Sequence, residues 1–117
     1  MTNRQRLTKD CDDLWRRIIK LKYKGRCGIC GGVGKDPHHI ARKNGQMRWL
    51  ILNGIWLCRK CHNHDHEHQM NIKISEKIGL DLFVHLYELD QEVKGYKEWE
   101  LLMVKAGLQI ELKRIKT

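Results

Sequence analysis

The chain has 117 residues, of which 41% are hydrophobic and 32% are charged, and its formal net charge is +9. This length suits one small domain and is too short for two independent cores. No apolar run reaches the roughly 20 residues needed to span a bilayer, and the polar start MTNRQRLTKDCDD lacks the apolar stretch of a signal peptide. The composition therefore argues against a membrane protein and predicts a soluble, cytoplasmic chain with no membrane partner.

The positive charge is concentrated towards the N-terminus. Residues 1–35 carry ten Lys or Arg against three Asp, residues 36–70 carry five against three, and residues 71–117 carry eight against eight. Such a basic region is typical of proteins that bind a polyanion, most often nucleic acid, although a solvated basic surface gives the same charge count. The charge therefore favours a nucleic-acid partner without establishing one.

The first predicted element is a helix over about residues 9–24. Apolar residues recur at 11, 14, 15, 18 and 21, with Thr8 or Asp10 as a possible N-cap and Gly25 as the stop. Cys11 lies on this helix, and we expect it to serve packing. The opposite face is basic, and we interpret it as a surface for nucleic acid, with a solvated face as the alternative. The basic residues on this face are Arg16, Arg17 and Lys20.

Two Cys-x-x-Cys pairs follow, Cys27 with Cys30 and Cys58 with Cys61. In a compartment that keeps thiols reduced, five cysteines in a short chain indicate metal binding rather than disulfides. Each pair can grip a tetrahedral zinc ion from a tight turn, and two pairs supply the four ligands of a closed structural site. The spacing therefore predicts a structural four-cysteine zinc site, with buried structural or redox cysteines as the alternative.

Between the two pairs, HHIA is predicted to be the end of a short strand, and IWLC, which is rich in β-forming residues, is predicted to be a second strand after a loop of about residues 42–53. The loop carries candidates for phosphate contacts, which are Arg42, Lys43 and Arg48. The run HNHDHEHQMN after Cys61 continues from a knuckle and contains no Gly or Pro, so it is predicted to be a helix.

The rest of the chain has two further helical patterns. One runs from about Ser75 to Lys94 despite Gly79, and the other runs from about Tyr96 to Ala106 with Gly107 as a stop. Both patterns carry apolar residues that are expected to face the core. These residues are Ile78, Leu82, Phe83, Leu86 and Tyr87 in the first helix and Trp99, Leu102 and Met103 in the second.

Six of the seven histidines lie at 38, 39, 62, 64, 66 and 68. On a helix, His62 and His66 share one face while His64 and His68 share roughly the opposite one. Because His62 follows directly on Cys61, we favour His62 and His66 as the inner pair. Neighbouring residues on a strand point to opposite faces, so His38 and His39 need different roles. One of them can complete an open three-His metal site, and the other can act as a general base; surface groups or ligands of a second zinc are the alternative.

The order Cys-x-x-Cys, His-His, Asn, Cys-x-x-Cys-His, His over residues 27–66 resembles the HNH endonuclease family, whose active site is a ββα-metal motif, in its zinc-stapled form. The metal site is also similar to that of the colicin-type DNases, and HIARKNGQMRW is similar to small phage-encoded HNH proteins linked to recombination. The resemblance implies a metal ligand at His38, the general base at His39, and Asn53 as the residue that holds the base and its loop. It implies His62 and His66 as the helix ligands of one divalent ion, which is Mg²⁺, Mn²⁺, Ni²⁺ or Zn²⁺.

We therefore expect an α+β fold in which a small ββα-metal core, about residues 27–70, is stapled by the four-cysteine zinc site. An N-terminal helix and a helical C-terminal part over about residues 75–106 flank this core, and a single HNH nuclease domain spans residues 1–117. The expected activity is hydrolysis of phosphodiester bonds in double-stranded or branched DNA, by a single-metal mechanism with His39 as base. The chief alternative is a non-catalytic zinc-binding module that binds nucleic acid, and an RNase would share the same site.

Overall fold

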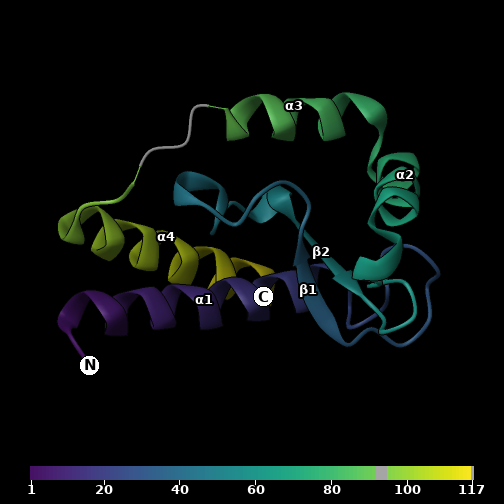
Figure 1. Cartoon of the computed structure of the whole chain (residues 1–117). Helices are drawn as coiled ribbons and strands as arrows, with labels where there is room; N and C mark the ends of the chain where they lie inside the picture. Colours follow the sequence, from purple (N-terminus) through teal and green to yellow (C-terminus); the bar gives the residue numbers. More distant parts are fainter. Residues whose placement is uncertain (92–94, 117) are drawn as a thin grey trace.

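The computed structural model describes residues 1–91 and 95–116 (Figure 1). Within this part of the chain the structure is α+β, with four α-helices and one two-stranded antiparallel sheet, as predicted. The elements are α1 Asn3–Lys22, β1 Asp36–His39, β2 Gly54–Leu57, α2 Glu67–Ile78, α3 Leu80–Asp90 and α4 Glu98–Lys116. Single-turn 3-10 helices lie at Gly45–Met47, Ile51–Asn53 and His64–His66. No helix in these described ranges is long and apolar enough to cross a membrane.

Helix α1 begins well before the predicted residue 9. Thr2 caps it, because its hydroxyl accepts a hydrogen bond from the Gln5 backbone N–H at 3.1 Å while the Gln5 side chain accepts from the Thr2 N–H at 2.8 Å. The helix ends at Lys22, and the positive φ of 72° at Gly25 fits the predicted stop. The predicted N-cap at Thr8 or Asp10 is wrong because this capping box starts the helix two turns earlier.

Helix α4 lies along α1 and buries a core between the two helices (Figure 1). The inward residues of α4 are Leu101, Leu108 and Leu112. The prediction that Trp99, Leu102 and Met103 face inward is wrong, and so is the predicted stop at Gly107, since the helix continues to Lys116. A glycine inside a helix costs only about 1 kcal/mol relative to alanine, which the buried leucines on either side of it offset.

A second core lies between the strand hairpin and helices α2 and α3. It contains Ile40, Met47, Ile55, Leu57, Met70, Ile74 and Leu86. The single helix predicted from Ser75 is broken at Gly79, whose φ of 96° is a conformation that other residues rarely adopt. The predicted end of that helix at Lys94 lies outside the described residues.

The sheet pairs Asp36 with Leu57 and His39 with Gly54. The first strand ends at His39, two residues before the end of the predicted stretch HHIA, and the second begins one residue before IWLC. Helix α1 packs directly on β2: a Cβ at Gly54 would lie 2.5 Å from the Ile19 Cδ1 atom and 2.7 Å from the Trp15 ring. Because Gly54 pairs with His39, this close approach also brings α1 against the end of β1, which carries the two adjacent histidines.

Candidate metal centre and active site

The four predicted cysteine ligands form one cluster. Their sulfur atoms all lie within 4.8 Å of one another, and the Sγ atoms of Cys30 and Cys58 are 3.7 Å apart. Four sulfurs at about 2.3 Å from a tetrahedral zinc ion would be about 3.8 Å apart, so the spacing fits that ion. Gly31, with φ of 76°, closes the first turn by donating from its N–H to the Cys27 carbonyl at 3.0 Å. The cluster could therefore hold a zinc ion, as the sequence predicts.

The pKa values of two thiols in this cluster, Cys27 and Cys61, are shifted in opposite directions. Burial acts to raise the pKa of Cys27, but hydrogen bonds from backbone N–H groups lower it to about 6. Burial and the neighbouring sulfur atoms raise the pKa of Cys61 to about 12. Crowded thiolates repel one another, and a divalent cation is the group that would permit all four sulfurs to ionise together.

His38 points to the face of β1 that meets the segment after the second cysteine pair. Its ring centroid lies 5.0 Å from that of His62 and 6.1 Å from that of His64, and the last two rings are 4.7 Å apart. Burial lowers the pKa of His38 to about 4 and also lowers the pKa of His62, so both rings are neutral at pH 7. Neutral imidazoles are good ligands for transition metals. Their ligand atoms do not converge as the sulfurs do, since within the described residues only the cysteines form such a tight group.

The structure does not bring His66 to this group. Helix α2 begins at Glu67, while the Asn63 side chain accepts from the Asp65 N–H at 3.1 Å and starts a separate 3-10 turn over residues 64–66. The helix predicted to run on from Cys61 is therefore wrong for residues 62–66, and His62 and His66 share no helical face. His66 instead lines a hollow of about 210 Å³ with Lys60 and Lys73. His64 was missed because a continuous helix would have turned it away from His62.

His39 points to the opposite face of β1, as the alternation of a strand requires. Its ring stacks on Trp15 at 4.2 Å with an interplanar angle of 9°, and its Nε2 atom lies 2.8 Å from the Arg48 carbonyl oxygen. A carbonyl only accepts, so Nε2 carries the proton and Nδ1 keeps its lone pair. Nδ1 has no hydrogen-bond partner among residues 1–91 and 95–116. Burial lowers the pKa of His39, so this ring is neutral and able to accept a proton.

Asn53 closes the segment that joins the two strands. The side chain is fully buried; its Oδ1 accepts from the Ala41 N–H at 2.8 Å, and its Nδ2 donates to the Met47 carbonyl at 3.1 Å. Its own carbonyl accepts from the Ile40 N–H at 2.8 Å. One buried amide therefore ties both ends of residues 40–47, directly after His39.

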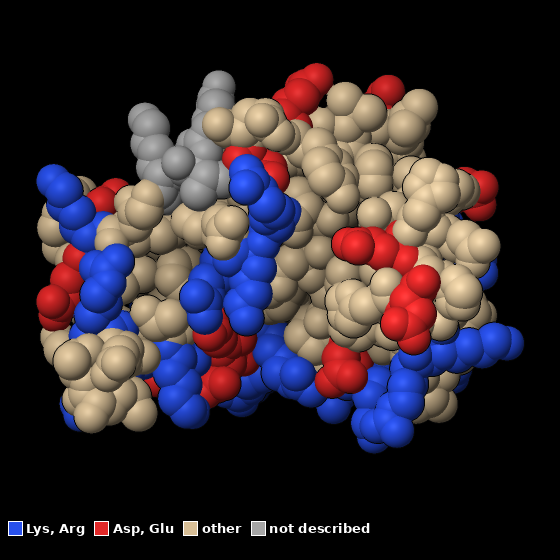
Figure 2. Space-filling view, in the orientation of Figure 1, with Lys and Arg blue, Asp and Glu red and all other residues tan. Residues whose placement is uncertain are grey.

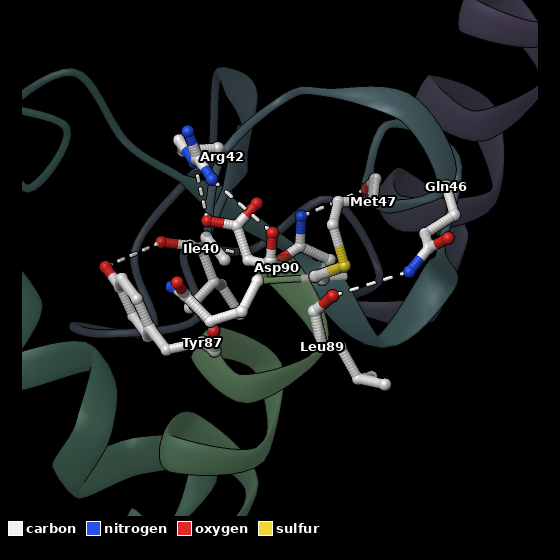
Figure 3. Close-up of polar contacts among 10 residues, drawn as sticks. Ile40, Arg42, Gln46, Met47, Tyr87, Leu89 and Asp90 are labelled. Carbon is white, nitrogen blue, oxygen red and sulfur yellow. Dashed lines mark hydrogen bonds and ion pairs between the residues drawn. The ribbon is translucent and has the colours of Figure 1, made fainter. Parts of the chain in front are cut away.

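Helix α3 holds the same segment from outside (Figure 3). Tyr87 donates from its hydroxyl to the Ile40 carbonyl at 3.2 Å, and Arg42 donates from Nε to Asp90 Oδ2 at 2.6 Å. Asp90 is 3% exposed, whereas the Arg42 side chain is 61% exposed. Arg42, predicted as a phosphate contact, is thus tied to the fold, and no local signal marks its partner 48 residues away.

Arg48 is bound in the same way to α1. Its Nε and Nη2 atoms donate to the two carboxylate oxygens of Asp12 at 2.9 and 2.7 Å, and the Trp49 indole N–H donates to Asp12 at 2.8 Å. The carbonyl of this arginine is the one that holds the His39 ring. The predicted phosphate contact is therefore half-buried in an ion pair, and Asp12 is a residue of the site that the sequence did not identify.

A hollow of about 400 Å³ lies beside His39, lined also by Asp12, Asp13, Asp36, Arg16 and Lys43. Lys43 is exposed and makes no hydrogen bond or ion pair within the described parts of the chain. Arg16 and Lys20 both lie over the Trp56 ring, at 5.4 and 6.0 Å.

Arg17, the remaining residue of the predicted basic face, lines a separate hollow with Lys105 of α4. The residues predicted as one basic face therefore do not share one hollow, since Arg16 lines the hollow beside His39 and Arg17 lines the hollow beside α4. Figure 2 shows Lys and Arg gathered over the interstrand segment and along the lower edge of this face, with Asp and Glu among them. The exposed surface around the hollow is therefore mixed in charge rather than uniformly basic.

Comparisons with known proteins give no relative for this chain. No protein-family model matches it, no curated protein is significantly similar to it, and no solved structure matches its fold. The function is therefore argued from the residues and their geometry.

Proposed function

We propose that this chain is a metal-dependent endonuclease of the HNH type that hydrolyses phosphodiester bonds in DNA. The single observation that carries the proposal is the arrangement of two neighbouring histidines at the end of β1. His39 has its Nε2 held by a backbone carbonyl and its Nδ1 without a partner in the described residues, while the His38 ring lies near the rings of His62 and His64. A proton acceptor beside a group of potential metal ligands suits hydrolysis of a phosphodiester.

His39 acts as the general base in this proposal. Its Nδ1 accepts a proton from the water that attacks phosphorus, while the Arg48 carbonyl keeps the ring in the tautomer that leaves Nδ1 available. The Trp15 ring stacked on it limits rotation of the imidazole. Asn53 holds the chain after the base, so the position of the base does not depend on a mobile loop.

His38 and His62 would hold the catalytic divalent ion, with His64 as the third ring of the group. When bound, such an ion supplies positive charge that stabilises the phosphate oxygens as negative charge develops on them. Three neutral nitrogen ligands suit transition metals better than Mg²⁺. The strand hairpin with the following α2 would then be a ββα-metal core, and the zinc ion in the four-cysteine site would be structural.

Charge around the hollow supports a phosphate ligand on the His39 side. Its three carboxylates each have a cation close by: Asp12 is bound by Arg48 at 2.7 Å, Asp13 by Lys9 at 3.0 Å and Asp36 by Arg16 at 3.5 Å. These pairs offset the negative charge of the lining. Lys43 then supplies a positive charge at the hollow and is the strongest candidate for a phosphate contact.

The test is incubation of the zinc-loaded protein with supercoiled plasmid, and separately with RNA, in the presence of Mg²⁺, Mn²⁺, Ni²⁺ or Zn²⁺. Nicked or linear plasmid should form with the wild type and be strongly reduced with His39→Ala. His85→Ala, which removes an exposed histidine on α3, should cut at the wild-type rate. Cleavage of RNA alone would change the substrate, and no cleavage of either nucleic acid with any ion would refute the nuclease in favour of a binding module.

A further inference from the structure

Helix α4 is apolar on two opposite sides. Its inner side packs on α1 through Leu101, Leu108 and Leu112, which are 1–8% exposed. At about 100° per residue, a second set of small and apolar residues falls within about 100° of arc on the far side of the helix. This outer stripe consists of Trp99, Leu102, Met103, Ala106 and Ile110. A surface helix normally carries polar residues on the side away from the core, so the outer stripe is a departure that needs an explanation.

The outer stripe is well exposed and continuous. Trp99 is 59% exposed, Leu102 53%, Met103 65% and Ile110 69%. From the usual sizes of these side chains, the exposed apolar area is on the order of 400–500 Å². This lies in the upper part of the roughly 300–600 Å² of the largest apolar patch on a typical monomer, a patch that is often an interaction site.

The chemistry of the outer stripe disfavours nucleic acid as its partner. Between Trp99 and Ile110 the one basic residue is Lys105, and its Nζ atom is directed at α1, where it lies 3.0 Å from Asp10 Oδ2. A phosphate backbone requires Lys or Arg at the contact. The stripe therefore fits an apolar protein surface.

We propose that the outer stripe is the interface of a homodimer in which two copies of α4 pack antiparallel. The charges of the helix support this orientation, since Glu98 and Glu100 lie in its first turn, while its other end holds Lys113, Arg114 and Lys116 against one acid, Glu111, which pairs with Arg114. An antiparallel pair sets the acidic end of each helix beside the basic end of the other, whereas a parallel pair would set like charges together.

The sizes of the stripe residues support the same arrangement. A two-fold axis between residues 103 and 106 sets Trp99 against Ile110 of the second copy and Met103 against Ala106, so that a larger side chain meets a smaller one at each contact. Because the interface is two-fold symmetric, each contact is made twice. Two such patches and their rims would bury about 1,000 Å², which is at the lower limit for a specific interface and suits micromolar dissociation. The inference does not depend on the proposed nuclease activity.

The experiment is sedimentation velocity on the full, zinc-loaded chain between about 1 and 200 µM. The wild type should shift from monomer to dimer over this range. Met103→Lys and, separately, Ile110→Lys should remain monomeric at 200 µM with an unchanged circular dichroism spectrum. Leu80→Lys is the matched control, because Leu80 is 66% exposed but lies on α3, and it should dimerise like the wild type.

A mixing experiment tests whether the partner is a second copy in this orientation. Met103→Lys and Met103→Glu should each be monomeric alone, and an equimolar mixture should recover the dimer because unlike charges then meet near the two-fold axis. A wild type that stays monomeric at 200 µM would overturn the proposal and leave the outer stripe to a different protein. A dimer that both the Met103 and Ile110 variants retain would overturn it as well, since the interface would then lie elsewhere.

Discussion

Asp12→Ala should lower both the stability of the protein and the rate of cleavage, although Asp12 is not proposed to contact the substrate. Asp12 accepts three hydrogen bonds, two from Arg48 and one from Trp49, at 2.7–2.9 Å. Its side chain is 39% exposed and that of Arg48 is 29% exposed, so water replaces part of what Asp12→Ala removes. Discounted for this solvent access, we expect a loss of about 2 kcal/mol in the free energy of unfolding. For a chain of this size that corresponds to roughly 8 °C in Tm.

The ionised carboxylate provides this stability at neutral pH. Burial acts to raise the pKa of Asp12, but the hydrogen bonds from Arg48 and Trp49 outweigh it and the pKa is lowered. A carboxyl with a lowered folded-state pKa contributes stability that is present above its unfolded pKa of about 3.9 and is lost as the pH falls through the folded value. The comparison with Asp12→Ala is therefore made at pH 7, where the contribution is complete.

The consequence for the site follows from the Arg48 carbonyl that orients His39. With Arg48 released, the base loses its fixed partner, and kcat for plasmid cleavage should fall by about 10- to 100-fold with KM nearly unchanged. The assays are thermal unfolding, cleavage kinetics and the ¹⁵N NMR signals of the His39 ring, which report its tautomer even in the absence of activity.

Asp13→Ala is the matched control, since it removes the same charge from the same hollow but only an exposed ion pair with Lys9. It should change stability by at most about 0.5 kcal/mol and leave kcat unchanged. If Asp12→Ala leaves kcat and the His39 signals as in the wild type, Asp12 positions nothing and serves stability alone.

Three further outcomes are expected. Purified protein should contain one tightly bound zinc per chain. Cys58→Ser should lose the zinc and the fold, while Cys11→Ala, which changes a buried packing residue, should keep the zinc. A zinc-free wild type with an unchanged circular dichroism spectrum would contradict the structural site. In calorimetric titration with Ni²⁺ after zinc loading, His64→Ala should weaken Ni²⁺ binding at least 10-fold, and His66→Ala should leave it unchanged. Weaker Ni²⁺ binding by His66→Ala but not by His64→Ala would restore His66 as the ligand. Lys43→Ala should reduce the slope of the logarithm of the DNA-binding constant against the logarithm of the salt concentration by about 0.9. Lys105→Ala is the control, because Lys105 is bound to Asp10, and it should leave this slope unchanged. Equal slopes for both variants would exclude Lys43 as a phosphate contact.

The features that follow from short-range patterns were predictable from the sequence. The first strand ends two residues before its predicted end and the second begins one residue before its predicted start, because β-forming residues and the cysteine pairs delimit them. The four cysteines meet as their spacing requires. The predicted residue for holding the interstrand segment, Asn53, is buried there and bonded at both ends of it. The strands and each cysteine pair are marked by neighbouring residues, whereas the role of Asn53 follows from the resemblance to the HNH family.

The features that depend on tertiary contacts were not predictable. Asp12 and Arg48 are 36 residues apart, and Arg42 and Asp90 are 48 apart, so each arginine is an exposed basic residue by sequence and an ion-pair partner in the fold. The inward side of α4 was predicted wrongly because this helix is apolar on both sides, and only its packing on α1 selects the leucine side.

The general-base role of His39 is tested most directly by comparing cleavage with binding in one variant. Single-turnover cleavage of a short DNA duplex by His39→Ala should be slower than that by the wild type by about 10²- to 10⁴-fold. Its Kd for the same duplex and its zinc content should be unchanged. His39 is not a ligand of the four-cysteine zinc site and is not a charged contact for DNA at pH 7. A His39→Ala protein that cleaves DNA as fast as the wild type would contradict the base assignment and, with it, the mechanism proposed for this site.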